Sequence, residues 1–364
     1  MHSSAARRWS LLLALLLLFI PSLELLAQSK KKTTRRRRAA PRYTAPSYGD
    51  PTAEDSLAGE DPVTREIAVR ALGNYNGSVV VSEADTGRVL TIVNQKQALS
   101  SGFKPCSTIK LAVGLAALEE GLITGDTLIK VARRKSLNLT DALAHSDNPF
   151  FEILGRKMGF DTVSAYARLV GLGELAGYLI EDEYPGSFPT EPPANGGVGR
   201  MCSYGEEIKV TPLQLAALMG AFANGGTLYY LQYPRTEEER AEFQPRVKRR
   251  LPIQQWLPQL RAGMEAAVLY GTARVAATPS LEGQVLGKTG TCGEDQAKLG
   301  WFASYGVLPT GQKLAVVVLL RGGRVFSGSK AAEIAQEVYK ELSQRYQLAA
   351  TPAAGASSGP ANNR

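Results

Sequence analysis

Histidine is nearly absent from this chain, and the shortage limits the chemistry that the chain can support. Only His2 and His145 occur among 364 residues. His145 stands beside a Ser-Asp-Asn turn, where a role at a rim or in packing is a simpler interpretation than a role as a base. The sequence also lacks the glycine-rich loop that binds phosphate groups. We therefore expect neither a metal ion nor another cofactor.

Cysteine and long apolar runs are scarce as well. The chain has three cysteines, so one thiol stays unpaired if the other two form a disulfide in an exported protein. We expect Cys202 to be buried and unreactive. The apolar stretch 11–20 follows two arginines and is too short for a comfortable membrane span. A candidate cleavage site follows at residues 25–27. We predict that residues 1–27 are a signal peptide, with an uncleaved anchor as the alternative.

The net charge of +8 arises almost wholly at the N-terminus. Residues 1–42 contain ten Lys and Arg against one acid, whereas residues 43–364 contain 32 Lys and Arg against 33 Asp and Glu. The neutral remainder gives no reason to expect nucleic-acid binding. Residues 28–65, basic and then rich in Pro, Ala, Ser and Thr, are predicted to be a solvated linker; contact of its basic part with anionic lipid or wall polymers is the alternative. Residues 349–364 are predicted to be a disordered tail.

Three short motifs do occur, in a fixed order. They are Ser107-Thr108-Ile109-Lys110, Ser146-Asp147-Asn148 and Lys288-Thr289-Gly290. Each alone has an ordinary explanation: a helix N-cap with a solvated lysine, a turn, and the corner of a hairpin. The ordered triplet is far more specific, because it is typical of active-serine acyl transferases that react with penicillin.

The first motif offers a nucleophile and a base. If Ser107 and Lys110 open a helix, both side chains lie on one face within a single turn, and the apolar stretch 111–118 predicts that helix. A serine hydroxyl is a poor nucleophile until a base takes its proton. A buried lysine serves as that base when desolvation and a second cation lower its pKa, and Lys288 is the natural second cation.

The other motifs supply groups that handle the substrate. Ser146 offers a hydroxyl that relays a proton to the leaving nitrogen, and Asn148 offers an amide that holds the substrate backbone. Lys288 and Thr289 are predicted to contact the substrate as well.

Residues 284–291 are predicted to form a strand that binds the substrate along its edge. Gly290 leaves room for a peptide to lie against this strand by β-augmentation. The backbone N–H groups of Ser107 and Thr291 are then expected to form an oxyanion hole.

Further segments match a known family. They are Asn76–Val81, Asp85–Leu90, Asn148–Phe151, Leu172–Glu174, Val210–Ala216, Ala223–Gly226, Gly271–Ala273 and Trp301–Phe302. With these segments and the three motifs, the chain resembles the transpeptidase domain of penicillin-binding proteins over residues 66–346. The likeness fails at residues 203–207, where the family usually has a glycine-rich turn.

The resemblance implies a serine D,D-transpeptidase or D,D-carboxypeptidase that acts on the D-Ala-D-Ala stem peptides of peptidoglycan. It implies an acyl-enzyme on Ser107, with β-lactams as covalent inhibitors. It also implies an exported protein of the periplasm or cell envelope. The basic residues after position 27 oppose this, since positive charge there favours retention on the cytoplasmic side.

A second likeness concerns the cysteines. Some carbapenem-hydrolysing serine β-lactamases have a cysteine pair at the relative positions of Cys106 and Cys292, within the same Lys-Thr-Gly-Thr-Cys-Gly string. This likeness implies a Cys106–Cys292 disulfide in an oxidising compartment. Two small buried thiols are the alternative.

Two other functions stay open. A serine β-lactamase needs a carboxylate that activates water, and residues 191–195, Glu-Pro-Pro-Ala-Asn, faintly resemble the Glu-Pro-x-x-Asn loop of class A enzymes. The other function is a β-lactam sensor or a scaffold in wall assembly that is acylated without turnover.

The coarse pattern predicts an α+β fold. We expect a hairpin near 78–93, strands at 284–292, 299–307 and 313–321, and a closing helix over 330–348. These predict an antiparallel sheet of about five strands flanked by N- and C-terminal helices, with an adjoining all-helical subdomain and the site between them. The catalytic domain is predicted to span residues 66–348.

Overall fold

The computed structural model describes residues 43–277 and 284–350, with side chains up to residue 345. The predicted signal peptide, the linker up to residue 42 and the tail from residue 351 lie outside these described residues. No helix within the described ranges is both long and apolar enough to cross a membrane.

The described residues contain short and long strands. Their bounds are β1 Gly77–Glu83, β2 Val89–Val93, β3 Ile129–Ala132, β4 Lys135–Leu137, β5 Thr227–Tyr229, β6 Val247–Arg250, β7 Val285–Glu294, β8 Ala297–Val307 and β9 Lys313–Gly322. The predicted hairpin (β1 and β2) and the three predicted C-terminal strands (β7 to β9) are thus confirmed.

Helices fill most of the remaining described chain. They are α2 Pro62–Leu72, α3 Gln95–Leu99, α4 Lys110–Glu119, α5 Leu139–Ala144, α6 Asn148–Met158, α7 Phe160–Leu169, α8 Gly197–Tyr204, α9 Pro212–Ala223, α10 Glu237–Ala241, α11 Leu257–Leu269 and α12 Gly328–Ala350, with 3-10 turns η1 Cys106–Ile109 and η2 Arg274–Ala276. The predicted closing helix is α12.

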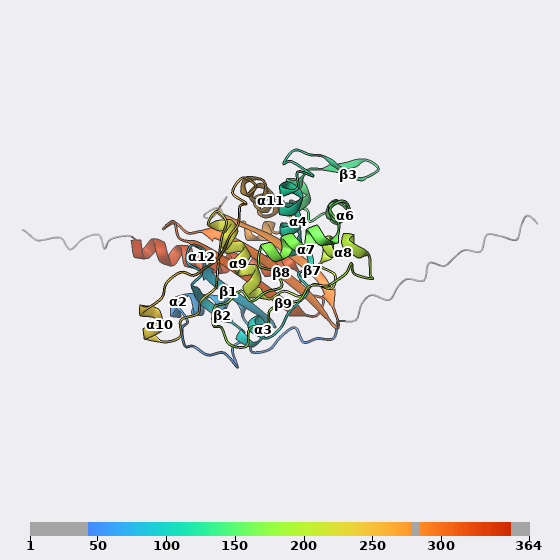
Figure 1. The fold of residues 1–364 in the computed structure, drawn as a ribbon. Helices are drawn as coiled ribbons and strands as arrows, with labels where there is room; N and C mark the ends of the chain where they lie inside the picture. The colour runs from blue at the N-terminus through green and yellow to red at the C-terminus, as the bar shows by residue number, and fades with distance from the viewer. Residues whose placement is uncertain (1–42, 278–283, 351–364) are drawn as a thin grey trace, which may run out of the picture. The chain divides into compact units, whose positions relative to one another are not determined.

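Five strands form one antiparallel sheet in the order β2-β1-β9-β8-β7. The sheet joins distant parts of the sequence, since β1 pairs with β9 from Gly77 opposite Leu320 to Glu83 opposite Leu314. Figure 1 shows this as blue strands lying beside orange and red ones. Strand β7, which contains the third motif, is the edge strand of the sheet.

Both faces of the sheet are covered by helices. Alternate residues of β1 point to opposite faces, so Val79 belongs to a core with α2 and α12, whereas Val80 belongs to a core with α9. Val316 and Val317 divide in the same way on β9. Helices α4 to α8 and α11 pack together beside the core that contains Val80 and α9, and they form the helical subdomain. The α+β architecture expected from the sequence is therefore present.

Helix α9 shows how local sequence fixes these elements. Thr211 is its N-cap, Pro212 is its first residue, and Thr211 and Gln214 form a capping box in which each side chain bonds the other's backbone N–H. The helix is buried on every side, and it packs on β1, β8 and β9 of the sheet and on β5 and α3.

Residues 43–61, which fall in the predicted linker, run along the domain as a strap. At one end, the N–H groups of Thr44 and Ala45 donate to the carbonyl of Gln296 in the β7–β8 turn, at 2.9 and 3.1 Å. The limits of the linker stay a prediction, but its described residues are bonded to the catalytic domain.

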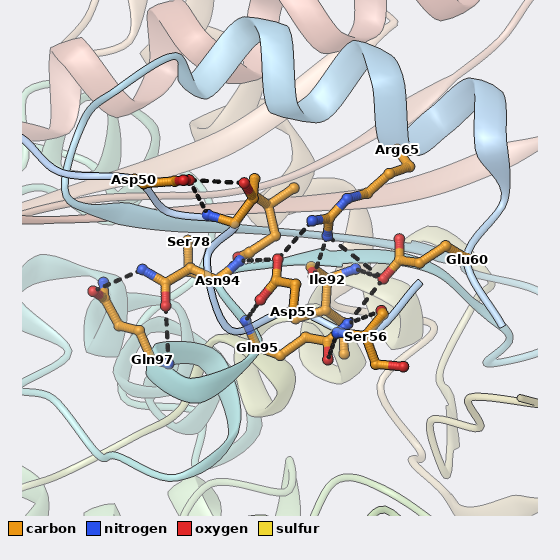
Figure 2. Close-up of polar contacts among 12 residues, drawn as sticks. Asp50, Asp55, Ser56, Glu60, Arg65, Ser78, Ile92, Asn94, Gln95 and Gln97 are labelled. Atoms are coloured by element: carbon orange, nitrogen blue, oxygen red, sulfur yellow. Dashed lines mark hydrogen bonds and ion pairs between the residues drawn. The ribbon is translucent and has the colours of Figure 1, made fainter. Parts of the chain in front are cut away.

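Two buried acids secure the other end of the strap (Figure 2). The carboxylate of Asp55 accepts from the N–H groups of Asn94 and Gln95, at 2.9 and 2.7 Å, and from Arg65 at 2.7 Å. Glu60 lies 3.7 Å from Arg65 and accepts from the hydroxyl of Tyr233. All three side chains of this ion-pair cluster are less than a tenth exposed.

Candidate active site

Ser107 lies at the junction of the sheet and the helical subdomain. It belongs to η1, and Lys110 is the first residue of α4. The sequence predicts that both residues share one helix; the structure instead places Ser107 in a 3-10 turn just before it. Cys106 has φ 52°, in the left-handed region, which costs a non-glycine residue about 1–3 kcal/mol. The surrounding contacts must hold this strained turn in place.

Lys110 connects the first two motifs. Its ammonium group is buried and donates to the carbonyl of Ser146 at 2.7 Å, to the Ser146 hydroxyl at 3.2 Å and to Asn148 Oδ1 at 2.6 Å. Ser146 itself has φ 55°, so its carbonyl and its side chain both face the lysine. The predicted base and the predicted relay are therefore in direct contact.

Ser107, the predicted nucleophile, has a different hydrogen-bond partner in this structure. Ser107 Oγ donates to the carbonyl of Ser203 at 3.4 Å, at the end of α8. Among the hydrogen bonds of the described residues, neither Lys110 nor Lys288 bonds the Ser107 hydroxyl. Catalytic hydrogen bonds often close only when the substrate is bound, so the contact between Lys110 and the Ser107 hydroxyl stays a prediction.

The two lysines have lowered pKa values. Lys288 on β7 is fully buried, donates to the Thr289 carbonyl at 3.0 Å, and has its pKa lowered by burial to about 7. Burial lowers the pKa of Lys110 well below its usual value, and the charge of Lys288 lowers it further, against the opposite effects of Asp147 and Glu152. Both shifts favour the neutral amine over the ammonium form.

The remaining residues of β7 are held by the neighbouring elements. Thr289 Oγ1 is hydrogen-bonded to Thr272 Oγ1 at 2.6 Å, and Thr291 Oγ1 accepts from the N–H of Gly328, at the start of α12, at 2.7 Å. A β-carbon at Gly290 would stand 3.0 Å from the carbonyl of Pro105. The structure thus gives a reason for Gly290 that the sequence did not: a glycine here lets Pro105, just before η1, lie against β7. Room for a bound peptide stays a prediction.

A disulfide connects the same two elements. Cys106 of η1 and Cys292 of β7 are bonded, with Cα atoms 5.5 Å apart, as the likeness of the cysteine pair implied. Cys202 is free and buried, and burial raises the pKa of its thiol to about 12, which agrees with the expected lack of reactivity.

These elements enclose a cavity of about 370 Å³. It is lined by Ser107, Ser146, Asn148, Tyr204, Thr272, Thr289, Thr291, Ser327 and Ser329. Members of all three motifs therefore meet in one cleft. Lys110 and Lys288 do not line it: both are buried behind the lining residues, with Lys110 bonded to Asn148 and Lys288 to the Thr289 carbonyl. Glu191, from the segment that resembles the class A loop, is exposed and is not among the lining residues.

Sequence reasoning missed four lining residues: Tyr204, Thr272, Ser327 and Ser329. Tyr204 is the most informative, because its hydroxyl accepts from Asn148 Nδ2 at 2.6 Å while Asn148 Oδ1 accepts from Lys110. Both ends of the Asn148 amide are thus fixed. The Arg200 guanidinium lies 5.0 Å from the centre of the Tyr204 ring. In the sequence, residues 203–207 around Tyr204 stand out only as a departure from the family pattern.

The geometry of the site agrees with a comparison of the whole chain. Residues 77–340 match the penicillin binding protein transpeptidase domain family. The chain belongs to this family. Stage V sporulation protein D of Bacillus subtilis is 29% identical over 227 residues, which are 55% of this chain and 34% of that protein. Penicillin-binding protein PbpB of Mycolicibacterium smegmatis is 26% identical over 349 residues, 80% of this chain and 53% of that protein.

Solved structures of penicillin-binding proteins share the fold. The transpeptidase domain of Burkholderia pseudomallei penicillin-binding protein 3 superposes with a TM-score of 0.67 at 21% identity, covering 83% of this chain and 98% of that one. Since the chain spans 53% or less of the length of the two relatives above, their full activities are not carried over directly.

Proposed function

We propose that this chain is a serine D,D-transpeptidase or D,D-carboxypeptidase that acts on the D-Ala-D-Ala end of peptidoglycan stem peptides. The observation that supports it is the meeting of all three motifs in one cavity, with two buried lysines of lowered pKa beside the nucleophile turn. We also propose that the protein is exported and acts in the periplasm or cell envelope, where this substrate occurs.

Acylation begins with the neutral amine of Lys110. It takes the proton of the Ser107 hydroxyl as Oγ attacks the carbonyl carbon between the two D-alanines. The N–H groups of Ser107 and Thr291 bind the oxyanion. Ser146 lies between Lys110 and the leaving nitrogen and passes a proton to it, so D-alanine departs and an ester on Ser107 remains.

Deacylation uses the same groups in reverse. An amine attacks the ester carbonyl in transpeptidation, or water attacks it in hydrolysis, and Ser107 recovers its proton through Lys110. The strained amide of a β-lactam is attacked in the same way, but its leaving nitrogen stays attached to the acyl group. β-Lactams are therefore expected to form a long-lived ester on Ser107.

One assay tests the proposal. The purified protein is incubated with a chromogenic cephalosporin while its intact mass is followed, with Ser107→Ala as the control. We expect a stable adduct on Ser107 and, in a separate reaction with protein that has not met the cephalosporin, D-alanine release from a stem pentapeptide. Rapid repeated turnover of the cephalosporin would support a β-lactamase instead, and a stable adduct without any activity on peptides would support a sensor or scaffold. If no adduct depends on Ser107, all of these functions are excluded.

A further inference from the structure

A two-stranded ribbon, residues 129–137, extends from the helical subdomain. Its strands, β3 and β4, form a sheet of their own that is separate from the five-stranded one. Ile129 and Val131 are partly buried against the core and Leu137 is buried, so one side of the ribbon is anchored. Figure 1 shows the ribbon reaching beyond α4 and α6.

The other side of this ribbon is strongly basic. Lys130, Arg133, Arg134 and Lys135 are all exposed. In the described part of the chain, Lys130, Arg133 and Arg134 have no ion-pair partner, although residues 43–364 as a whole are close to neutral. This concentration of charge does not stabilise the ribbon, because like charges at such short spacing repel one another. The result is a local positive field that attracts anions.

The ribbon is attached to the wall of the active-site cleft. Lys135 forms an ion pair with Asp147 at 3.0 Å. Asp147 stands between Ser146 and Asn148, which both line the cavity, and its other oxygen accepts from the N–H of Phe150 at 3.0 Å as the N-cap of α6. The ribbon is therefore connected, at Lys135, to the segment that supplies two lining residues of the cleft.

We propose that this basic ribbon is a docking arm for stem-peptide carboxylates that lie away from the scissile bond. The inference rests on the proposed function. Stem peptides are acidic chains, with free carboxylates besides the one on the terminal D-alanine. When the D-Ala-D-Ala end lies at Ser107, the rest of the peptide leaves the cleft, and the guanidinium groups of Arg133 and Arg134 pair with its carboxylates. The ion pair between Lys135 and Asp147 connects the ribbon to the cleft wall. This connection favours a ligand that also enters the cleft, such as a stem peptide, over a lipid surface.

The test compares two pentapeptides that end in D-Ala-D-Ala. They are identical, except that the upstream carboxylates are amidated in one of them. D-Alanine release is measured with an added D-amino acid acceptor, so that hydrolysis and transfer are both detected. The variants are Arg133→Glu/Arg134→Glu and, as a control with the same change in charge, Lys96→Glu/Arg240→Glu at exposed positions on α3 and α10. Acylation by a fluorescent penicillin checks that each variant is folded.

For Arg133→Glu/Arg134→Glu, we expect kcat/KM on the acidic peptide to fall about tenfold at low salt, and the difference to shrink as salt is raised. Turnover of the amidated peptide, acylation by penicillin and all rates of the control are expected to stay within about twofold. Equal losses on both peptides, or no loss, would overturn the inference. So would unchanged peptide turnover together with lost binding to phosphatidylglycerol vesicles, which would assign the ribbon to a membrane. A wild-type protein inactive on penicillin and on both peptides would instead reject the proposed function, and the inference with it.

Discussion

At the scale of single residues, the site depends on how burial changes two amines. A lysine in water is charged near neutral pH and cannot take a proton from serine. Lys110 and Lys288 are buried behind the lining of one cleft, where burial makes each charge unfavourable, and the charge of Lys288 lowers the pKa of Lys110 further. In the proposed mechanism, the surroundings of Lys110 therefore activate Ser107 as much as the identity of the base does.

This coupling predicts a shift in the pH dependence of acylation. Acylation needs neutral Lys110, so its rate falls as pH drops through the pKa of Lys110. Lys288→Gln removes the neighbouring cation, which raises the pKa of Lys110 and moves this acid limb to higher pH. The measurement is the acylation rate with fluorescent penicillin against pH, for folded wild type and variant. An unmoved limb, or one moved to lower pH, would contradict the coupling.

Lys110→Arg tests the base itself. The variant keeps a cation in place, but a guanidinium does not release its proton in proteins. We expect acylation to slow by about 10²–10⁴-fold, the usual contribution of a positioned base. Lys135→Arg, at the exposed ion pair with Asp147, is the matched control and should acylate at the wild-type rate. Equal rates for both variants would show that another group takes the proton.

Tyr204→Phe tests the hydrogen bond that fixes the Asn148 amide. The variant keeps the ring but removes the hydroxyl that accepts from Asn148 Nδ2. A net hydrogen bond is worth about 0.5–1.5 kcal/mol, so we expect acylation to slow by about two- to tenfold. Tyr166→Phe, which loses a surface bond to Glu120, should have no effect. If the two variants behave alike, Tyr204 does not orient Asn148.

At the scale of elements, the site depends on the contact between η1 and β7. The absence of a side chain at Gly290 brings Pro105 onto the strand, and the Cys106–Cys292 disulfide fixes the same pair of elements covalently. Together they hold Cys106 in its left-handed conformation and place Ser107 at the cavity. Ser107 is thus positioned by the sheet as well as by the 3-10 turn that contains it.

Removing the disulfide should measure this contribution. Cys106→Ala/Cys292→Ala is expected to lower the free energy of unfolding by about 2–5 kcal/mol, as determined by urea denaturation. Wild type treated with a reductant should move towards the variant, whereas the variant should not respond to the reductant. If the reductant leaves the free energy of unfolding of the wild type unchanged, the disulfide does not stabilise the domain.

The elements also show how far sequence reasoning reached. The strands and long helices were predictable, because they follow from apolar periodicity. That the three motifs meet in one site was predictable as well, because the chemistry requires their residues together. The 3-10 turn at Ser107 was not predictable, because apolar periodicity does not distinguish it from the first turn of the helix that follows. Tyr204 was missed for a related reason, since only the folded chain places it against Asn148. Composition alone also gave no sign that residues 43–61 would be bonded to the domain.

At the scale of the whole domain, that strap connects the two ends of the sheet. It is bonded to the β7–β8 turn at Gln296 and, through Asp55, to the end of β2. The edge strand with the third motif and the opposite edge of the sheet are therefore joined by one stretch of chain. Arg65 on α2 neutralises the buried acids that make this possible.

Arg65→Met should release the strap. The change leaves the carboxylates of Asp55 and Glu60 buried without their cation, so we expect a loss of about 3–5 kcal/mol in the free energy of unfolding. Lys96→Met, which removes only the exposed pair with Glu54, should cost about 1 kcal/mol or less. Thermal and urea denaturation of both variants give the comparison. Similar losses would place the cluster among ordinary surface ion pairs.

The position of β7 at the sheet edge limits how this site can vary over generations. The peptide groups along that edge persist whichever side chain a mutation installs, except proline. Mutation along the strand can therefore reshape the cleft without erasing its row of main-chain donors and acceptors.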